Sequence, residues 1–208
     1  MKENLMILGC FLLGIFIGMS GVSPEWLQGH DLSMAILSLL IVQIGISLGS
    51  GSHLQHIFRS LDLRSLLLPL FTIVGTLLFS AIGVLLLHGR NLSDCLLVGS
   101  GFGYYSLSSV LIADIKSATL GVQGATELAT IALLANIIRE MIALFGTPTL
   151  ARLGGRLVPI SVAGINSMDV CLPVIVRNTY KGEELIPLAI LLGIALEVSV
   201  PLLISAFG

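Results

Sequence analysis

Long apolar stretches separated by short polar connections constrain this chain more than any other feature of its sequence. Leu66–Leu87 contains no charged residue, and Leu185–Phe207 contains only Glu197. A helix that crosses a bilayer needs about 20 mostly apolar residues, because the hydrocarbon core is roughly 30 Å thick. Only 11% of the 208 residues are charged, against about 25% in soluble domains. The sequence therefore predicts an all-α, polytopic membrane bundle that forms a single domain over residues 1–208.

Seven stretches qualify as candidate spans, and we expect six or seven crossings from them. They are Leu5–Val22, Leu32–Gly49, Leu66–Leu87, Leu92–Ala113, Leu120–Leu150, Leu157–Val176 and Leu185–Phe207. The fourth is rich in glycine and the sixth is interrupted by proline, so each is compatible with crossing or with re-entry. The fifth is longer than a bilayer requires, so it tilts, bends near Gly146 and Pro148, or extends into water. The first is interpreted as a span rather than a signal peptide, because further spans follow it.

The basic residues of the loops indicate an orientation, since cytoplasmic loops carry an excess of Lys and Arg. Seven crossings with an internal N-terminus place six basic residues inside and three outside, with the C-terminus outside. The inner set is Lys2, Arg59, Arg64, Lys116, Arg177 and Lys181, and the outer set is Arg90, Arg152 and Arg156. One re-entrant segment would reverse every later assignment. The connection His53–Arg64 is predicted to be an amphipathic helix at the membrane interface.

Asp169 is the only charged residue within the apolar stretch Leu157–Val176. A carboxylate at that depth costs several kcal/mol unless water, a partner or a substrate meets it. Gly164, Asn166 and Ser167 precede the acid and Pro173 follows it, so the helix is predicted to be broken there. Many transporters build substrate or ion sites from broken helices at mid-depth. Asp169 is therefore our first candidate for a binding residue.

A second apolar stretch has the same character as the one around Asp169. Gly99–Ser109 reads GSGFGYYSLSS, and Ala163–Pro173 reads AGINSMDVCLP. Both place small residues in mid-span and follow them with hydroxyl or acid groups, and each follows a long helix. A helix followed by a broken helix therefore occurs twice, which is compatible with an inverted repeat, although small residues also serve close helix packing. The site candidates here are Gly101, Gly103, Tyr104, Tyr105, Ser106, Asn166 and Ser167, within a core predicted over residues 99–173.

The fifth stretch carries Asn136, Arg139 and Glu140 in LLANIIREMIALF. Asn136 and Glu140 share a helix face, because they are four residues apart. One arrangement pairs Arg139 with Asp169 and leaves Glu140 to titrate. Two interpretations stay open: a structural ion-pair cluster that holds two helices together, or a carboxylate that loads and unloads a cation or proton.

The remaining polar residues of the apolar stretches carry weaker signals. Glu197 is a second-rank site candidate deep in the last span, and Glu127 is another that we expect near a membrane surface. Cys10, Cys95 and Cys171 are interpreted as packing residues rather than as a disulfide or metal site. We expect no cofactor, no nucleic-acid partner and no enzyme activity, since neither of the two main intramembrane protease patterns, aspartyl and serine, occurs.

Three motifs resemble the bacterial lysine exporter family LysO. They are GFGYYSLSS (Gly101–Ser109), LLANIIREM (Leu133–Met141) and GINSMDVCLPVI (Gly164–Ile175). The resemblance implies export of L-lysine and its analogues across the bacterial inner membrane, with Glu140 and Asp169 as the important acids. Asn166 and Cys171 depart from the family, in which Thr is usual at both positions. Single-chain family members are longer, and this chain resembles the larger, C-terminal portion of a split two-chain form. The resemblance therefore implies a separate small membrane subunit of the same family as a partner, and a homo-oligomer is a further expectation.

These observations lead to one functional hypothesis and one alternative. The hypothesis is a secondary transporter that exchanges lysine for protons by alternating access, using Glu140 and Asp169. Arg139 and the unwound backbone at Gly101–Gly103 and Gly164–Ser167 would receive the substrate carboxylate. The alternative is a cation/proton antiporter or an ion channel that uses the same acids without an amino acid.

Overall fold

The computed structural model describes residues 63–86 and 90–208, together with residues 13, 16, 17, 39 and 42. The chain divides into two compact units, Met1–Leu39 and Leu40–Gly208. In the first unit, Leu13, Phe16 and Ile17 are helical and exposed. The predicted spans Leu5–Val22 and Leu32–Gly49, Cys10 and most of the predicted interfacial segment His53–Arg64 lie outside the described residues.

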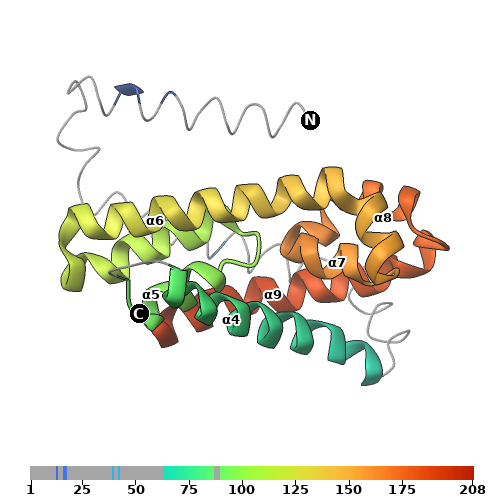
Figure 1. Cartoon of the computed structure of the whole chain (residues 1–208), viewed down its shortest axis with the longest axis horizontal. Coiled ribbons are helices and arrows are strands. Elements are labelled where there is room, and N and C mark those ends of the chain that lie inside the picture. Colours follow the sequence, from blue (N-terminus) through green and yellow to red (C-terminus); the bar gives the residue numbers. More distant parts are fainter. Residues whose placement is uncertain (1–12, 14–15, 18–38, 40–41, 43–62, 87–89) are drawn as a thin grey trace. The chain divides into compact units, whose positions relative to one another are not determined.

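Every regular element that the structure describes in the second unit is a helix, as the sequence predicts for a membrane bundle (Figure 1). The α-helices are α4 (Leu67–Leu86), α5 (Leu92–Gly99), α6 (Tyr105–Gly154), α7 (Val158–Ala163), α8 (Leu172–Asn178) and α9 (Ile186–Phe207). The 3-10 helices are η2 (Leu63–Leu66), η3 (Gly164–Met168) and η4 (Gly182–Leu185).

Helix α6 is two helices that meet at Gly121. This glycine has φ 70° and ψ 168°, and it is the one position within α6 whose backbone is not helical. A positive φ favours glycine, which has no Cβ to clash with the backbone. The chain reverses direction there, which gives a first part (residues 105–120) and a second part (residues 122–154) (Figure 1). The second part continues through Gly146 and Pro148 as helix, so its excess length is not relieved by a break at those residues.

The fourth predicted span is a re-entrant hairpin, which we call the first hairpin (residues 92–120). One arm is α5, the other is the first part of α6, and Ser100–Tyr104 form the tip. The two ends of this segment meet, because Lys116 Nζ lies 3.6 Å from Asp94 Oδ1 and 3.2 Å from Ser93 Oγ. A segment whose ends meet returns to the side from which it entered.

The sixth predicted span is also re-entrant, and we call it the second hairpin (residues 158–178). Its arms are α7 and α8, and η3 with residues 169–171 forms the tip. Arg156, just before the hairpin, lies 3.2 Å from Glu184, just after it. The arms have six and seven residues, and at about 1.5 Å per residue neither is longer than roughly 11 Å. Each arm therefore reaches only part of the way through a bilayer.

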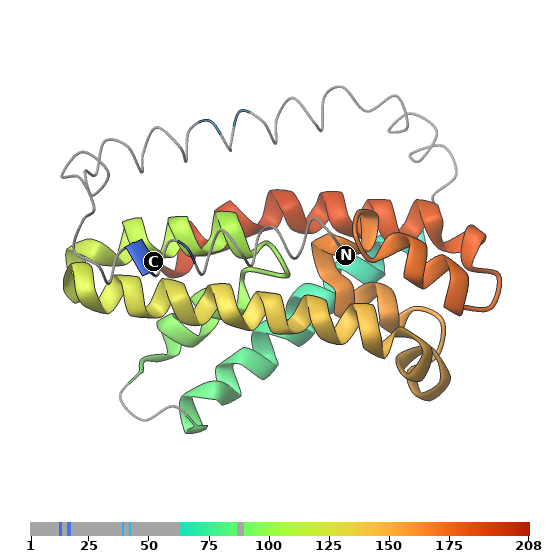
Figure 2. The same cartoon turned by 90° about the horizontal axis from the view of Figure 1, so that it is seen from above.

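The hairpins enter from opposite ends of the bundle, and α9 shows this directly. Helix α9 begins beside the second hairpin, directly after Glu184, and ends beside the first, where Ser93 Oγ bonds the carbonyl of Phe207. Its 22 residues span about 33 Å, the thickness of a bilayer core. Figures 1 and 2 agree that α5 and the turn at Gly121 lie at one end and that α7 and α8 lie at the other.

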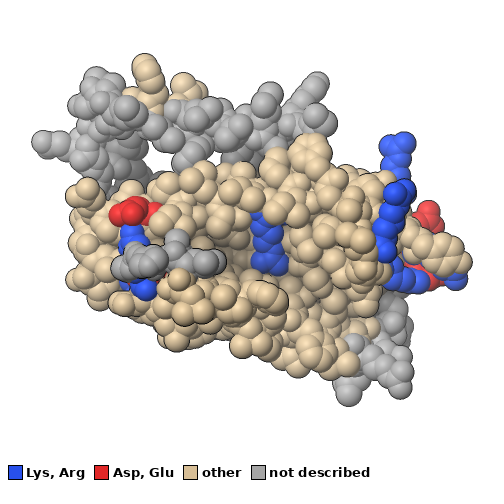
Figure 3. All heavy atoms as spheres, viewed as in Figure 1, with Lys and Arg blue, Asp and Glu red and all other residues tan. Residues whose placement is uncertain are grey.

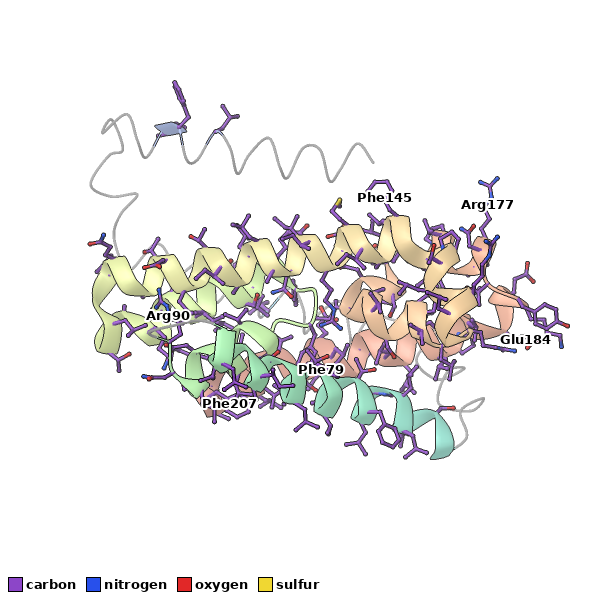
Figure 4. All side chains as sticks on the ribbon, in the orientation of Figure 1. Phe79, Arg90, Phe145, Arg177, Glu184 and Phe207 are labelled. Atoms are coloured by element: carbon purple, nitrogen blue, oxygen red, sulfur yellow. The ribbon has the colours of Figure 1, made fainter. Side chains whose placement is uncertain are left out.

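Three helices in the described part of the chain are long and apolar enough to cross a membrane: Leu67–Leu85, Tyr105–Gly154 and Gly182–Phe207. In the space-filling view, charge gathers at the two ends, and the band between them is apolar except for a blue patch near its centre (Figure 3). Arg90 and Phe207 lie at one end, Arg177 and Glu184 at the other, and Phe79 and Phe145 project outward between them (Figure 4). Crossing by the third, fifth and seventh predicted spans is therefore supported.

The predicted assignment of basic residues to the two sides of the membrane was wrong. It assumed that the fourth and sixth apolar stretches both cross the membrane. Lys116 lies at the same end as Arg90, and Arg152 and Arg156 lie at the same end as Arg177 and Lys181. The described part thus carries two basic residues at the first hairpin's end and five at the second's, where Arg64 of η2 leads into α4.

The inverted repeat that the sequence suggested is visible in the order of the elements. Helix α4 precedes the first hairpin, and the second part of α6 precedes the second hairpin. Thr72, near the start of α4, bonds Ser161 of the second hairpin at 3.0 Å. Gly83, near its end, lies beside Cys95 of the first hairpin. The two helix-and-hairpin units therefore run in opposite directions.

Candidate functional site

The tips of the two hairpins meet midway between the ends of the bundle. The backbone N–H of Ile165 donates to the carbonyl oxygen of Phe102 at 3.1 Å. Gly164 has φ 62°, and a Cβ there would lie 2.2 Å from that same oxygen. Asn166 Nδ2 lies 3.5 Å from the carbonyl oxygen of Gly103. Two unwound backbones cross here, which is the geometry that frees N–H and C=O groups for a ligand.

Asn136 anchors the first tip to the second part of α6. Its Oδ1 accepts the N–H of Gly103 at 2.8 Å, and its Nδ2 donates to Ser108 Oγ at 3.3 Å and to the carbonyl of Ala132 at 2.9 Å. The amide is 3% exposed, so these bonds replace water for a buried polar group. Asn136 therefore serves to position the tip.

Arg139 anchors the second hairpin and does not form the pair with Asp169 that the sequence allowed. Its Nε donates to the carbonyl of Val162 at 2.8 Å, and its Nη2 donates to the carbonyl of Ser161 at 2.9 Å. These carbonyls lie in the last turn of α7, where a cation is favoured by the helix dipole. The guanidinium also lies 6.0 Å from the ring centroid of Phe102. Arg139 thus holds the end of one hairpin against the tip of the other.

The two leading acids lie on the two elements that meet at the tips. Glu140 is in the second part of α6 and is 4% exposed, whereas Asp169 follows η3 and is exposed. The carboxylates of both act electrostatically on the hydroxyl of Tyr105 and on the thiol of Cys171. Glu140 and Asp169 therefore form one cluster around Tyr105 and Cys171, in which Glu140 is buried and Asp169 is exposed.

The two second-rank acids, Glu197 and Glu127, lie in different parts of the bundle. Glu197 is 8% exposed, and it interacts electrostatically with Asp169 and with Tyr104. Glu127 lies far from this cluster, because its carboxylate pairs with Arg90 at 2.8 Å and its side chain is 64% exposed. Glu127 is therefore on the surface of the protein, and it is not part of the candidate site.

Other predicted site residues make hydrogen bonds within the tips or between a tip and the bundle. Ser167 Oγ bonds the carbonyl of Ala189 at 3.0 Å, which ties η3 to α9. The carbonyl of Asn166 accepts the N–H groups of Asp169 and Cys171, and the carbonyl of Gly101 accepts that of Tyr104. The carbonyl of Ser106 accepts a bond from Ser109 Oγ within α6.

Sequence reasoning missed Phe102 and Ser108. Phe102 is fully buried, adopts a left-handed φ of 44°, bonds Ile165 and lies beneath Arg139. Its place between two glycines was the available signal, because a large residue at an unwound point must pack against something. The partner of Ser108, Asn136, is 28 residues distant, so no local pattern predicts their contact.

The chain is a helical membrane bundle whose two re-entrant hairpins meet beside Glu140 and Asp169, and many transporters build binding sites from broken helices of this kind. The comparisons with known proteins narrow that class. The chain belongs to the lysine exporter family LysO, whose profile matches residues 8–208, as the three motifs predicted.

Two relatives place the chain within this family. It is 31% identical over 208 residues to the lysine exporter LysO of Escherichia coli K12, which covers 99% of this chain and 64% of that protein. It is 27% identical over 204 residues to a candidate lysine exporter of Haemophilus influenzae, which covers 97% and 96% respectively. The chain therefore spans less than two thirds of the first relative and nearly all of the second. No solved structure matches the chain.

Proposed function

We propose that this chain exports L-lysine and close analogues across the bacterial cytoplasmic membrane in exchange for protons. The observation that carries the proposal is the cluster of Glu140 and Asp169 at the meeting point of the two tips. The names of the two relatives support lysine as the substrate. The function is therefore that of a transporter rather than an enzyme.

The chemistry of lysine suits this cluster. Lysine carries two ammonium groups and one carboxylate, so its binding site needs anions away from bulk water and donors for one carboxylate. Glu140 and Asp169 supply the anions. The start of α6 at Tyr105 faces the first tip with free backbone N–H groups and the positive end of its dipole, and with Arg139 it supplies donors.

Proton exchange follows from the energetics of moving a cation outward. With an inside-negative potential, export of one positive charge costs about 2.3 kcal/mol per 100 mV. A proton that enters as lysine leaves offsets this cost. Either acid can carry the proton after lysine dissociates, because a carboxylate in this setting is stabilised by a proton or by a cation.

Alternating access has a structural basis in the opposed hairpins. Each hairpin reaches the cluster from its own end of the bundle, so displacement of one opens the cluster to one side only. The excess of basic residues at the second hairpin's end supports a cytoplasmic location for that end. We expect the second hairpin to control access from inside and the first to control access from outside.

The relatives suggest how the complete transporter is assembled. The E. coli protein is longer than this chain, whereas the H. influenzae protein is of similar length. We propose that a small membrane subunit of the same family, or a second copy of this chain, completes the assembly.

The test is efflux of labelled lysine from proteoliposomes that contain the wild-type chain, Asp169→Asn or Glu140→Gln. We expect either substitution to lower the rate at least about tenfold, since each removes an anion from the cluster. Glu127→Gln is the control, because that acid is exposed and paired with Arg90, and we expect the wild-type rate. Wild-type rates in both site variants would sink the assignment. Sodium flux that persists without lysine would favour a cation/proton antiporter instead.

A further inference from the structure

Glu197 lies halfway along α9, on the face that packs against the second tip. Ala189 and Gly193 lie on the same stripe at four-residue spacing. The carbonyl of Ala189 accepts the bond from Ser167, and a Cβ at Gly193 would lie 2.5 Å from Met168. One turn beyond Gly193, Glu197 comes next to the residue that follows Met168, which is Asp169.

Glu197 is 8% exposed as a whole residue, and no hydrogen bond or ion pair joins its carboxylate to a described residue. The carboxylate oxygens are not among the fully enclosed atoms of the described residues that have no partner, so they keep access to solvent. The other buried charges that the described contacts account for differ: Asp94 faces Lys116, and Arg139 binds two carbonyls. A carboxylate on a mostly enclosed residue with no cationic partner is stabilised by a proton or a cation, so this position can receive either.

The groups around Glu197 show which ligand would be held there. Helix α9 packs against η3, η4, α4, α5, α6, α7 and α8. Among the titratable groups of these elements and of the residues that join them, Asp169 and Tyr104 are those that interact with Glu197. Asp169 belongs to the second tip and Tyr104 to the first, so Glu197 lies where both tips end. Glu140, on α6, acts electrostatically on Tyr105, as Asp169 does. The three acids therefore come from α9, from the second tip and from α6.

We propose that Glu197 receives one of the two ammonium groups of the substrate and so selects diamino acids over neutral amino acids. The inference rests on the proposed function and deepens it. The two ammonium groups of lysine stand at opposite ends of a flexible side chain, so one carboxylate cannot bind both. Asp169, which is exposed, meets the substrate from the accessible side. A neutral amino acid would leave one buried carboxylate unpaired, and this penalty supplies the selectivity.

The test compares three ligands on the purified full chain in detergent. Lysine has both ammonium groups, norleucine keeps only the α-ammonium, and 6-aminohexanoate keeps only the ε-ammonium. Dissociation constants are measured for wild type, Glu197→Gln and the control Glu183→Gln, whose side chain is exposed in η4. We expect Glu197→Gln to weaken lysine and one of the two analogues by about tenfold or more. The other analogue and the control variant should keep wild-type constants.

Two results would overturn the proposal: equal weakening of all three ligands, or no change in any. Glu197→Asp keeps the charge on a shorter side chain and should weaken the same single analogue, which provides a second measurement if Glu197→Gln does not fold. The proposed function has a separate failure, because wild-type protein that binds no lysine would contradict it whatever Glu197 does.

Discussion

The backbone N–H of Ile165 donates to the carbonyl of Phe102 at 3.1 Å, and this bond joins the tips of two hairpins that enter from opposite ends of the bundle. Neither tip can move away from the other without breaking it. Arg139 reinforces the junction, because its guanidinium binds α7 and lies over the ring of Phe102. A hairpin that opens the cluster to one side must therefore slide along its partner or release these contacts.

Gly164→Ala should disrupt the junction between the tips. The new Cβ would lie 2.2 Å from the carbonyl oxygen of Phe102, at a φ of 62° that alanine tolerates poorly. We expect a loss of about 1–3 kcal/mol of stability and a severe loss of lysine efflux. Thermal unfolding in detergent and proteoliposome efflux measure the two effects. Gly75→Ala in α4 is the matched control, because nothing lies within 4 Å of its Cβ position, and unchanged behaviour of both variants would refute this account of the tips.

Asn136→Ala should loosen the first tip while leaving every acid in place. The substitution leaves the N–H of Gly103 without its partner, and an unmet buried donor costs about 1–3 kcal/mol. We expect lower thermal stability and slower efflux. Asn178→Ala provides the comparison, because the amide of Asn178 is exposed and bonds only the carbonyl of Val174 among the described residues. Equal effects of the two substitutions would contradict a positioning role for Asn136.

The buried pair of Lys116 and Asp94 should show strong coupling in a double-mutant cycle. Lys116 is 7% exposed and Asp94 is 4% exposed, so removal of one partner strands a buried charge at a cost of roughly 3–5 kcal/mol. We expect Asp94→Leu to be strongly destabilising and Asp94→Leu with Lys116→Met to recover much of the loss. Unfolding temperatures of the wild type, both single variants and the double variant complete the cycle. Additive effects would show that the two residues do not form the base of the first hairpin.

Single introduced cysteines should be labelled from the sides of the membrane that two re-entrant hairpins predict. In a chain without Cys10, Cys95 and Cys171, we expect cysteines at positions 156 and 181 to react with a membrane-impermeant maleimide from the cytoplasm. A cysteine at position 118 should react from outside. Labelling of 118 and 181 from one side would match seven simple crossings and contradict the hairpins.

The sequence predicted which residues lie at the hairpin tips better than it predicted how the chain crosses the membrane. The acids, the glycine-rich breaks and the family all followed from local patterns around Asp169 and Glu140. Re-entry did not, because a hairpin with two short arms uses about as many apolar residues as one straight crossing. Hydropathy alone therefore cannot separate Leu157–Val176 as a span from the same residues as a hairpin.

Arg139 shows the second limit of the sequence. The sequence allowed an ion pair with Asp169, whereas the hydrogen-bond partners of Arg139 among the described residues are the carbonyls of Ser161 and Val162. The need for a cation there arises from the broken end of α7, which exists only once the chain has folded. Glu127 and Glu197 illustrate the same point, since similar acids in apolar surroundings lie at a surface and at the tips respectively.

Simultaneous recording of lysine efflux and proton influx in the same proteoliposomes tests the central claim most directly. The wild-type chain should move protons inward as lysine leaves, at a fixed ratio, and Asp169→Asn should abolish both fluxes together. Lysine efflux at the wild-type rate in Asp169→Asn, or efflux without proton movement, would contradict an exchange carried by the acids at the hairpin tips.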